Sequence, residues 1–313
     1  MTESPRDGSA GDGQAGVLIR ERIPKSLTDG AGVAWTEVGA PSGRPVIFLH
    51  GWPSSRLMGR VWAATALRRG WRVLAPDRPG IGQSPRRDGW SFAAWPPVFA
   101  AFLDECGIAG CPVIGLSGGG PYALAAAAAL PERVAAVAVI SGAPPLDAAA
   151  DRAFIMREFQ ILAAVESRAP WLLRGGFRLA GPVLARFDVP LARSLMRVFG
   201  RQPDEMFMAS QASEFTISSG IEAWHQGGRG VYEEGRLYLK SWGFDPAAIR
   251  RPAALWHGGD DPFFHWSLAE RLAHRIPGAT FTRVAGEGHF TPVYRVQDQV
   301  FDWLERADAS ASS

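Results

Sequence analysis

Short apolar runs and stretches with helical spacing alternate along most of the chain. The runs are bounded by Gly, Pro or charged residues and predict buried strands at residues 45–50, 71–75, 112–116, 134–140, 252–257 and 280–284. Two earlier segments predict a pair of strands joined by a turn, at residues 17–23 and 31–38. Apolar positions repeated every three or four residues predict helices at 56–69, 92–106, 120–130, 266–275 and 292–306. This alternation predicts an α/β fold, with a mostly parallel sheet and helices on both faces.

The strand pattern is interrupted between residues 146 and 241. Apolar residues there recur with helical spacing, at 154–165, 171–184, 191–199 and 204–215. A helical block between two halves of a parallel sheet is typical of a cap over a site. We therefore expect a core and an inserted cap flanked by flexible tails. The boundaries are 1–16 for the N-terminal tail, 17–145 and 242–307 for the core, 146–241 for the helical cap, and 308–313 for the C-terminal tail.

The composition argues against several classes of protein. A chain of 313 residues, 47% of them apolar, can bury a core without covalent or metal support. Lys plus Arg is 33 and Asp plus Glu is 31, a near-balance that argues against nucleic-acid binding. Cys106 and Cys111 are too few for a disulfide scaffold or a Cys-rich zinc module. Reduced thiols are favoured over a local disulfide if the protein is cytosolic.

No targeting or membrane-spanning segment is evident in the sequence. Residues 1–16 lack the apolar core of a signal peptide, and the most apolar run, 122–130, is too short to cross a bilayer. We therefore predict a cytoplasmic protein with no membrane partner, and the oligomeric state is left open.

The clearest chemical signal is Gly115-Leu116-Ser117-Gly118-Gly119, a G-x-S-x-G motif between a predicted strand and a predicted helix. In that context a tight, strained turn raises the Ser above the carboxyl end of the sheet, and small neighbours let strand and helix approach. A glycine-rich turn without chemistry is the alternative, but the strand–turn–helix context favours a nucleophile. Ser117 is the candidate nucleophile.

A Ser nucleophile needs a general base and a carboxylate that orients the base. Among six His, His289 lies in a Gly-flanked loop after the last predicted strand, where it can reach over the sheet; a surface histidine is the alternative. Asp260 and Asp261 both follow the strand at 252–257, and Asp147 is a weaker third candidate.

An oxyanion hole requires two backbone N–H groups. Gly118 follows the nucleophile and supplies one. The turn His50-Gly51-Trp52-Pro53 follows an earlier strand and fits the second, with Trp52 donating because Pro53 has no N–H. His50 is interpreted as a structural hydrogen-bonding group rather than a base.

A metal site is a weaker interpretation of the segment that contains both candidate acids. His257, Asp260, Asp261 and His265 are close in sequence, but no second cluster completes a ligand set. The chain has no P-loop and no G-x-G-x-x-G fingerprint, so we expect neither a metal nor a cofactor.

On these motifs the chain resembles the α/β-hydrolase superfamily in its lid-bearing form. The matching segments are His50-Gly51-Trp52-Pro53, Asp77-Arg78-Pro79-Gly80-Ile81-Gly82-Gln83-Ser84, Gly115-Leu116-Ser117-Gly118-Gly119, and His257-Gly258-Gly259-Asp260-Asp261 with Gly288-His289. The resemblance covers residues 17–145 and 245–307 and implies that Asp261, in H-G-x-x-D, is the acid. The Ser nucleophile departs from haloalkane dehalogenases and epoxide hydrolases, which use Asp. The run of residues 118–121 also departs from the pattern of lipases.

The resemblance implies a serine hydrolase that cleaves an ester, lactone, thioester or amide through an acyl-enzyme on Ser117. His289 would act as base, Asp261 would orient it, and Trp52 and Gly118 would hold the oxyanion. A lyase or cyclase on the same residues is one alternative, and a non-catalytic binding protein on a hydrolase scaffold is another.

The predicted partner is a small, largely apolar molecule. The predicted cap contains four large apolar side chains that suit an apolar pocket: Trp171, Phe207, Met208 and Trp224. Packing within the cap is nevertheless the favoured interpretation for them.

Overall fold

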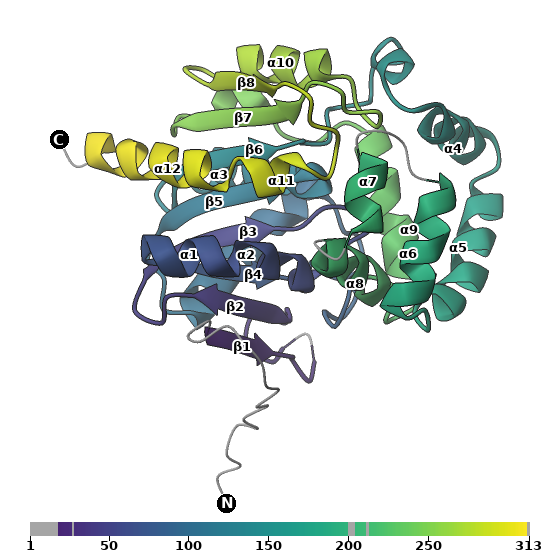
Figure 1. Cartoon of the computed structure of the whole chain (residues 1–313), viewed down its shortest axis with the longest axis horizontal. Helices are drawn as coiled ribbons and strands as arrows, with labels where there is room; N and C mark the ends of the chain where they lie inside the picture. The colour runs from purple at the N-terminus through teal and green to yellow at the C-terminus, as the bar shows by residue number, and fades with distance from the viewer. Residues whose placement is uncertain (1–17, 27, 200–203, 211–212, 312–313) are drawn as a thin grey trace, which may run out of the picture.

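Eight strands form one sheet in the computed structural model of the protein, in the order β1-β2-β4-β3-β5-β6-β7-β8 (Figure 1). The structure describes residues 18–26, 28–199, 204–210 and 213–311. The strands are β1 (Leu18–Arg22), β2 (Trp35–Gly39), β3 (Arg44–Leu49), β4 (Trp71–Pro76), β5 (Cys111–Leu116), β6 (Val134–Ile140), β7 (Ala253–Gly258) and β8 (Thr280–Val284).

The sheet is mostly parallel, as the sequence predicts. β1 pairs antiparallel with β2, and β2 with β4, whereas β4, β3, β5, β6, β7 and β8 run parallel. All six residues of β5 are buried, because a central parallel strand is covered on both faces.

Helices cover both faces of this sheet. On one face α12 lies beside α1, and Phe301 stacks on Trp71 with 5.3 Å between ring centroids (Figure 1). On the other face α2, α3 and α10 bury a separate cluster that includes Phe102 and Tyr122. The bounds are α1 (Ala63–Arg69), α2 (Trp95–Glu105), α3 (Gly120–Ala129), α10 (Trp266–Arg275), α11 (Pro292–Arg295) and α12 (Gln297–Ala311).

A helical insertion separates β6 from β7. Its helices gather at one end of the sheet, where β5 leads into Ser117 (Figure 1). They are α4 (Arg157–Arg168), α5 (Pro170–Leu184), α6 (Val189–Phe199), α7 (Asp204–Ala209), α8 (Glu214–Glu222) and α9 (Gly228–Gly235), followed by the 3-10 turn η6 (Arg236–Leu239).

Several element boundaries differ from the predicted ones. The second strand begins at Trp35 rather than at residue 31, and the helix expected at 56–69 is a 3-10 turn, η1 (Arg56–Trp62), followed by α1. Where a single helix was predicted at 204–215, α7 ends at Ala209 and α8 begins at Glu214. α9 was missed because three glycines weaken its helical pattern.

The ends of the chain bear on two further expectations. α12 extends to Ala311, into the segment predicted as a C-terminal tail, and the predicted N-terminal tail lies outside the described residues. Among the described helices, none is long and apolar enough to cross a bilayer. Cys106 and Cys111 are free thiols, and burial raises the pKa of both to about 12.

Candidate active site

Ser117 stands on a strained turn between β5 and α3. Its φ is 50°, a left-handed conformation that is uncommon for a residue with a side chain. A Cβ on Gly115 would lie 2.8 Å from the carbonyl oxygen of Gly119, and a Cβ on Gly119 would collide with the carbonyl of Leu49. Only glycine at these positions lets the two strands and the helix meet so closely, which is the geometry that the motif predicts.

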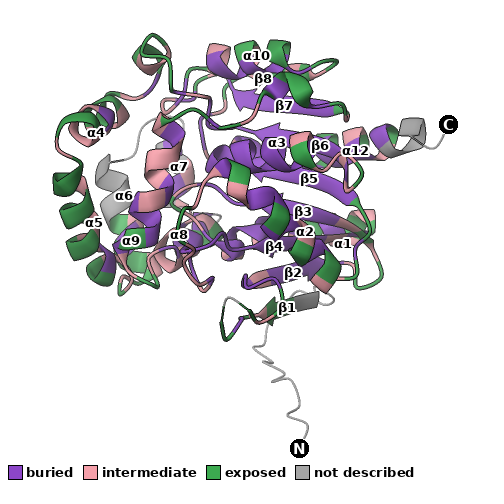
Figure 2. Cartoon of the chain, turned by 180° about the vertical axis from the view of Figure 1, so that it is seen from behind, coloured by how far each residue is buried: buried purple, intermediate pink, exposed green. Residues whose placement is uncertain are grey.

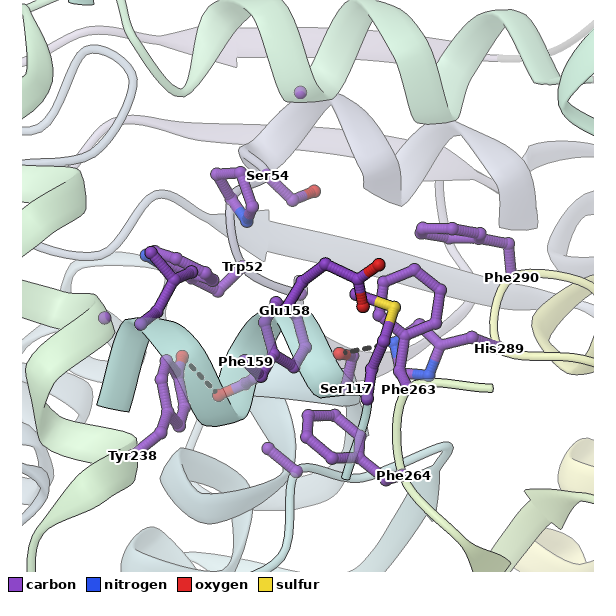
Figure 3. Close-up of a pocket in the computed structure, with 18 of the residues that line it drawn as sticks. Trp52, Ser54, Ser117, Glu158, Phe159, Tyr238, Phe263, Phe264, His289 and Phe290 are labelled. Carbon is purple, nitrogen blue, oxygen red and sulfur yellow. Dashed lines mark hydrogen bonds between the residues drawn. The ribbon is translucent and has the colours of Figure 1, made fainter. Parts of the chain in front are cut away.

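Three loops at the carboxyl ends of strands bring Ser117, His289 and Asp261 together. Ser117 Oγ lies 2.8 Å from His289 Nε2 (Figure 3). On the other side of the ring, His289 Nδ1 lies 2.8 Å from Asp261 Oδ2. Because Nδ1–H donates to the carboxylate, Nε2 is left to accept the Ser117 hydroxyl proton. The arrangement can deprotonate the hydroxyl and stabilise the resulting imidazolium.

The carboxylate of Asp261 is held by four donors. Oδ1 accepts from the backbone N–H groups of Phe263 and Phe264, at 2.7 and 3.1 Å. Oδ2 lies 2.8 Å from His289 Nδ1 and 2.9 Å from His257 Nε2. Burial favours the protonated carboxyl, but the charge of His289 and the hydrogen bonds from both imidazoles outweigh it and hold the pKa of Asp261 well below its ordinary value.

The other candidate acids lie apart from this site. Asp260 is exposed although it neighbours Asp261, and Asp147 is also exposed. The four residues of the metal interpretation do not converge, since His265 is exposed and its Nδ1 lies 2.8 Å from the Ser267 hydroxyl. In the part of the chain that the structure describes, no group of three or more His, Cys, Asp or Glu side chains could hold a metal ion.

Two residues that the sequence reasoning did not assign contact the imidazole or its loop. His257 is fully buried and shares Asp261 with His289; its position in H-G-x-x-D was a signal for this contact. Asp204, at the start of α7 in the insertion, accepts from the N–H of His289 at 2.6 Å and of Phe290 at 2.9 Å. No local pattern marks Asp204, whose partner is 85 residues away.

These carboxylates also alter the acidity of His289. Burial disfavours the imidazolium, but the charges of Asp261 and then Asp204 favour it more strongly, so the pKa of His289 lies above its ordinary value of 6.5. Burial in turn raises the pKa of Asp204.

The turn at residues 50–53 adjoins the nucleophile. A Cβ on Gly118 would lie 2.9 Å from Trp52 Cβ, so the backbones of these two residues are neighbours. His50 Nδ1 lies 2.9 Å from the Gly51 carbonyl oxygen, and burial and then nearby Arg78 lower its pKa well below 6.5. A buried neutral imidazole that bonds its own turn fits the structural interpretation of His50.

Arg78 supports this turn by hydrogen bonds to two of its carbonyl oxygens. It is fully buried and donates to the carbonyl oxygens of His50 at 2.6 Å and Gly51 at 2.8 Å, while its Nε pairs with Glu234 of α9. The Tyr238 hydroxyl donates to the Gly118 carbonyl at 3.0 Å (Figure 3). Residues of the insertion therefore hold both backbone segments beside Ser117.

A second polar contact ties the insertion to the sheet. Arg56 donates from its backbone N–H and its guanidinium to Asp77, at 2.5 and 3.0 Å. The same guanidinium lies 2.8 Å from Glu222 of α8. Arg56 thus joins the 77–84 turn to a helix of the insertion.

A cavity of about 720 Å³ opens above Ser117 and His289, between the sheet and the insertion. Its walls are mainly aliphatic and aromatic, and Phe159, Phe263 and Phe264 lie around Ser117 (Figure 3). Two of the residues proposed for an apolar pocket, Met208 and Trp224, line it.

The other two do not contribute to the cavity. Trp171 is 69% exposed on the outside of α5. Phe207 packs on Tyr294 with ring centroids 4.7 Å apart. Helical spacing shows that a residue belongs to one face of a helix, but not whether that face points inward.

A family model described as "alpha/beta hydrolase fold" matches residues 44–295. The chain belongs to the α/β-hydrolase fold family. It is 34% identical over 123 residues to a non-heme chloroperoxidase of Streptomyces lividans, covering 39% of this chain and 45% of that protein. It is 28% identical over 260 residues to a pimeloyl-[acyl-carrier protein] methyl ester esterase of Aromatoleum aromaticum, covering 78% of this chain and 90% of the esterase. The chain spans between 30% and 45% of the first three curated relatives that it matches.

Solved structures of low identity share the fold of this α/β hydrolase. A bromoperoxidase from Bacillus anthracis superposes with a TM-score of 0.69 at 16% identity, covering 91% of this chain and 100% of that one. A thermophilic esterase from Thermogutta terrifontis gives a TM-score of 0.61 at 20% identity, covering 93% of this chain and 99% of the esterase. These similarities concern the architecture and not the substrate.

Proposed function

We propose that this α/β hydrolase cleaves a carboxylic ester, lactone, thioester or amide through an acyl-enzyme on Ser117. The observation that carries the proposal is the hydrogen-bonded series Ser117–His289–Asp261 at the floor of the cavity. As Oγ bonds to the carbonyl carbon, His289 takes the Oγ proton and then gives it to the leaving group. Water then attacks the acyl-enzyme, with His289 again accepting the proton, and Ser117 is regenerated.

The N–H groups of Gly118 and Trp52 are the proposed oxyanion donors. Their backbones adjoin beside Ser117, and Tyr238 and Arg78 bond the neighbouring carbonyls, which restrains both peptides before substrate arrives. Donors that need no reorganisation stabilise the transition state, and one such donor is typically worth about 10²–10³ in kcat.

The helical insertion is the proposed substrate cap, and the substrate class is a medium-sized, largely apolar acyl compound. The cavity volume of about 720 Å³ and its aromatic lining support this class. The Aromatoleum relative, which covers most of this chain, is a methyl ester esterase by name, which favours an ester over an amide.

The test is covalent labelling followed by turnover of an ester panel. A fluorophosphonate should label Ser117, and Ser117→Ala should lose both the label and hydrolysis of p-nitrophenyl esters. Ser54→Ala is the matched control, because Ser54 lines the same cavity but bonds Ser219 rather than a histidine. Hydrolysis retained by Ser117→Ala would exclude the assignment. A labelled Ser117 with no trapped acyl-enzyme in mass spectrometry would favour a lyase or cyclase.

A further inference from the structure

Helix α5 is apolar on both of its long sides. Its inner side lines the cavity through Leu173, Phe177 and Leu184. Gly181 packs so closely on α9 that a Cβ there would collide with the backbone of Gly228, which anchors α5 in the insertion. An apolar side of a helix is normally buried, so the opposite side of α5 requires an explanation.

That opposite side is exposed to solvent. Leu172, Leu179 and Val183 are 51%, 78% and 56% exposed. At 100° per residue these three side chains fall within about 40° of one another on the helix. We call this stripe, together with the adjacent Trp171, the outer face of α5.

Nothing among the described residues covers the outer face. α5 forms the edge of the molecule in both views, and most of it is coloured exposed (Figures 1 and 2). A Cβ on Gly175 or Gly176, on the same side of the helix, would meet no atom within 4 Å. The outer face therefore projects beyond its surroundings and does not line a groove.

Positive charge gathers on α5 and on the residues that flank it. Arg178 lies on the flank of the helix next to Trp171, about 100–140° from the exposed apolar stripe, and Arg174 lies nearly opposite that stripe. Arg168 and Arg186 lie just outside the two ends of α5. Residues 168–186 contain four Arg and no Asp or Glu, although the whole chain carries only +2. All four guanidiniums belong to exposed residues: Arg168, Arg174, Arg178 and Arg186. Across residues 18–26, 28–199, 204–210 and 213–311, no ion pair joins any of them to a carboxylate; Arg186, for example, donates to the Pro182 carbonyl at 2.7 Å.

We propose that the outer face of α5 docks on the surface of an anionic lipid bilayer. Leu179, Val183 and Trp171 would enter the boundary between headgroups and acyl chains, and the guanidiniums of Arg168, Arg178 and Arg186 beside them would bind lipid phosphates. A protruding ridge of apolar and basic side chains suits a fluid, negatively charged surface. A second copy of the chain is disfavoured, because a two-fold contact through this face would bring together two copies of residues 168–186, which carry four Arg and no carboxylate.

This proposal changes one expectation from the sequence. The prediction of no membrane partner depended on the lack of a spanning segment, whereas surface docking through an amphipathic helix requires none. If the proposed function also holds, α5 alone, about 10 Å thick, would separate the bilayer from the cavity, so apolar esters dissolved in the membrane would lie next to their site.

The experiment is co-sedimentation of the full-length protein with vesicles. Wild type should bind vesicles of equal parts phosphatidylcholine and phosphatidylglycerol, bind pure phosphatidylcholine far less, and dissociate as salt is raised. Leu179→Ser/Val183→Ser should weaken binding by roughly tenfold or more. Arg178→Gln/Arg186→Gln should weaken it by about fivefold for each charge removed.

Two matched control variants change exposed residues in or next to β1, at the edge of the sheet and away from α5. Ile23→Ser removes an apolar side chain that is 50% exposed, and Arg20→Gln removes an exposed charge of β1; both should leave binding within about twofold of wild type. Equal binding by wild type and both α5 variants would overturn the proposal. So would a wild-type dimer that Leu179→Ser/Val183→Ser converts to a monomer, because a second copy would then cover the face. Vesicle binding without ester turnover would instead contradict only the proposed function.

Discussion

At the scale of single residues, Asp261 is the most constrained group of the site. Its two oxygens accept from two backbone N–H groups and two imidazoles, so the carboxylate has one orientation and stays ionised. In the proposed reaction ionisation matters, because an imidazolium forms at His289 and needs a neighbouring negative charge. The adjacent Asp260 is exposed and makes no such set of contacts among the described residues.

The two adjacent carboxylates should therefore differ sharply in their importance. Asp261→Asn keeps the shape of the side chain but favours the wrong tautomer of His289. In a serine protease the equivalent change lowered kcat by about 10⁴, and we expect kcat to fall at least about a hundredfold here. Asp260→Asn should cost less than about tenfold. Both variants, with Asp147→Asn as a further control, would be assayed on one activated ester. A crippled Asp260→Asn beside a nearly normal Asp261→Asn would show that the acid is misassigned.

The pH dependence should reflect the raised pKa of His289. The base must be neutral, so kcat/KM should rise with pH and reach half its plateau above pH 6.5. Asp204→Asn removes one of the two charges that raise this pKa, and should move the midpoint to lower pH. Initial rates on a slow ester across the pH range would measure both midpoints. An unchanged midpoint in Asp204→Asn would show that Asp204 only braces the loop.

At the scale of elements, the helical insertion contributes to the support of the site as well as to the cavity wall. α7 provides Asp204 for the loop of His289, α9 provides Glu234 for Arg78, and η6 provides Tyr238 for Gly118. The turn at residues 50–53 thus depends on a buried ion pair with one partner in the sheet domain and the other in the insertion.

Breaking this ion pair should destabilise the protein. Glu234→Gln leaves the fully buried charge of Arg78 without its carboxylate, which we expect to lower the free energy of unfolding by about 3 kcal/mol. Glu222→Gln is the matched control, because Arg56 keeps Asp77 and Glu21; we expect a cost below about 1 kcal/mol. Urea unfolding of the two variants would measure the difference. If both variants lose the same free energy of unfolding, the Arg78–Glu234 pair stabilises the protein no more than the Arg56–Glu222 pair does.

Whether a residue of the site could be predicted from the sequence depends on how far along the chain its contact partners lie. Ser117 lies in a local motif and His289 follows a strand with a strong apolar pattern, so the sequence locates both. The apolar patterns left the acid open between Asp260 and Asp261, and the resemblance to the family selected Asp261. Asp204 bonds a partner 85 residues away, and Arg78 and Glu234 are 156 residues apart. Contacts at such distances depend on how the insertion packs on the sheet, and no local spacing encodes that packing. The glycine-rich α9 was missed for a different reason, since its intrinsic helix propensity is low.

At the scale of the whole molecule, the insertion has two parts with different roles. The segment from α9 to η6 carries the partners of Arg78 and Gly118, and Tyr238 belongs to the same buried cluster as the sheet. The helices from α4 to α8 supply much of the cavity wall, from Phe159 to Ile221. We therefore expect the first part to be needed for folding and the second for acyl selectivity.

Two replacements by a Gly/Ser linker would separate these roles. Replacing residues 146–241 removes Glu234 and Tyr238, so the product should be largely insoluble, because Arg78 loses its carboxylate partner and apolar cavity surface becomes exposed. Replacing only 157–222 keeps both residues and should leave a folded core. This shorter variant loses apolar cavity wall, so its kcat/KM ratio for p-nitrophenyl octanoate over acetate should fall by roughly tenfold, the value of burying about two methylenes. It also loses Asp204, so Asp204→Asn is the baseline against which the ratio is compared. If the shorter variant discriminates between the two esters as wild type does, the helices from α4 to α8 do not bind the acyl chain.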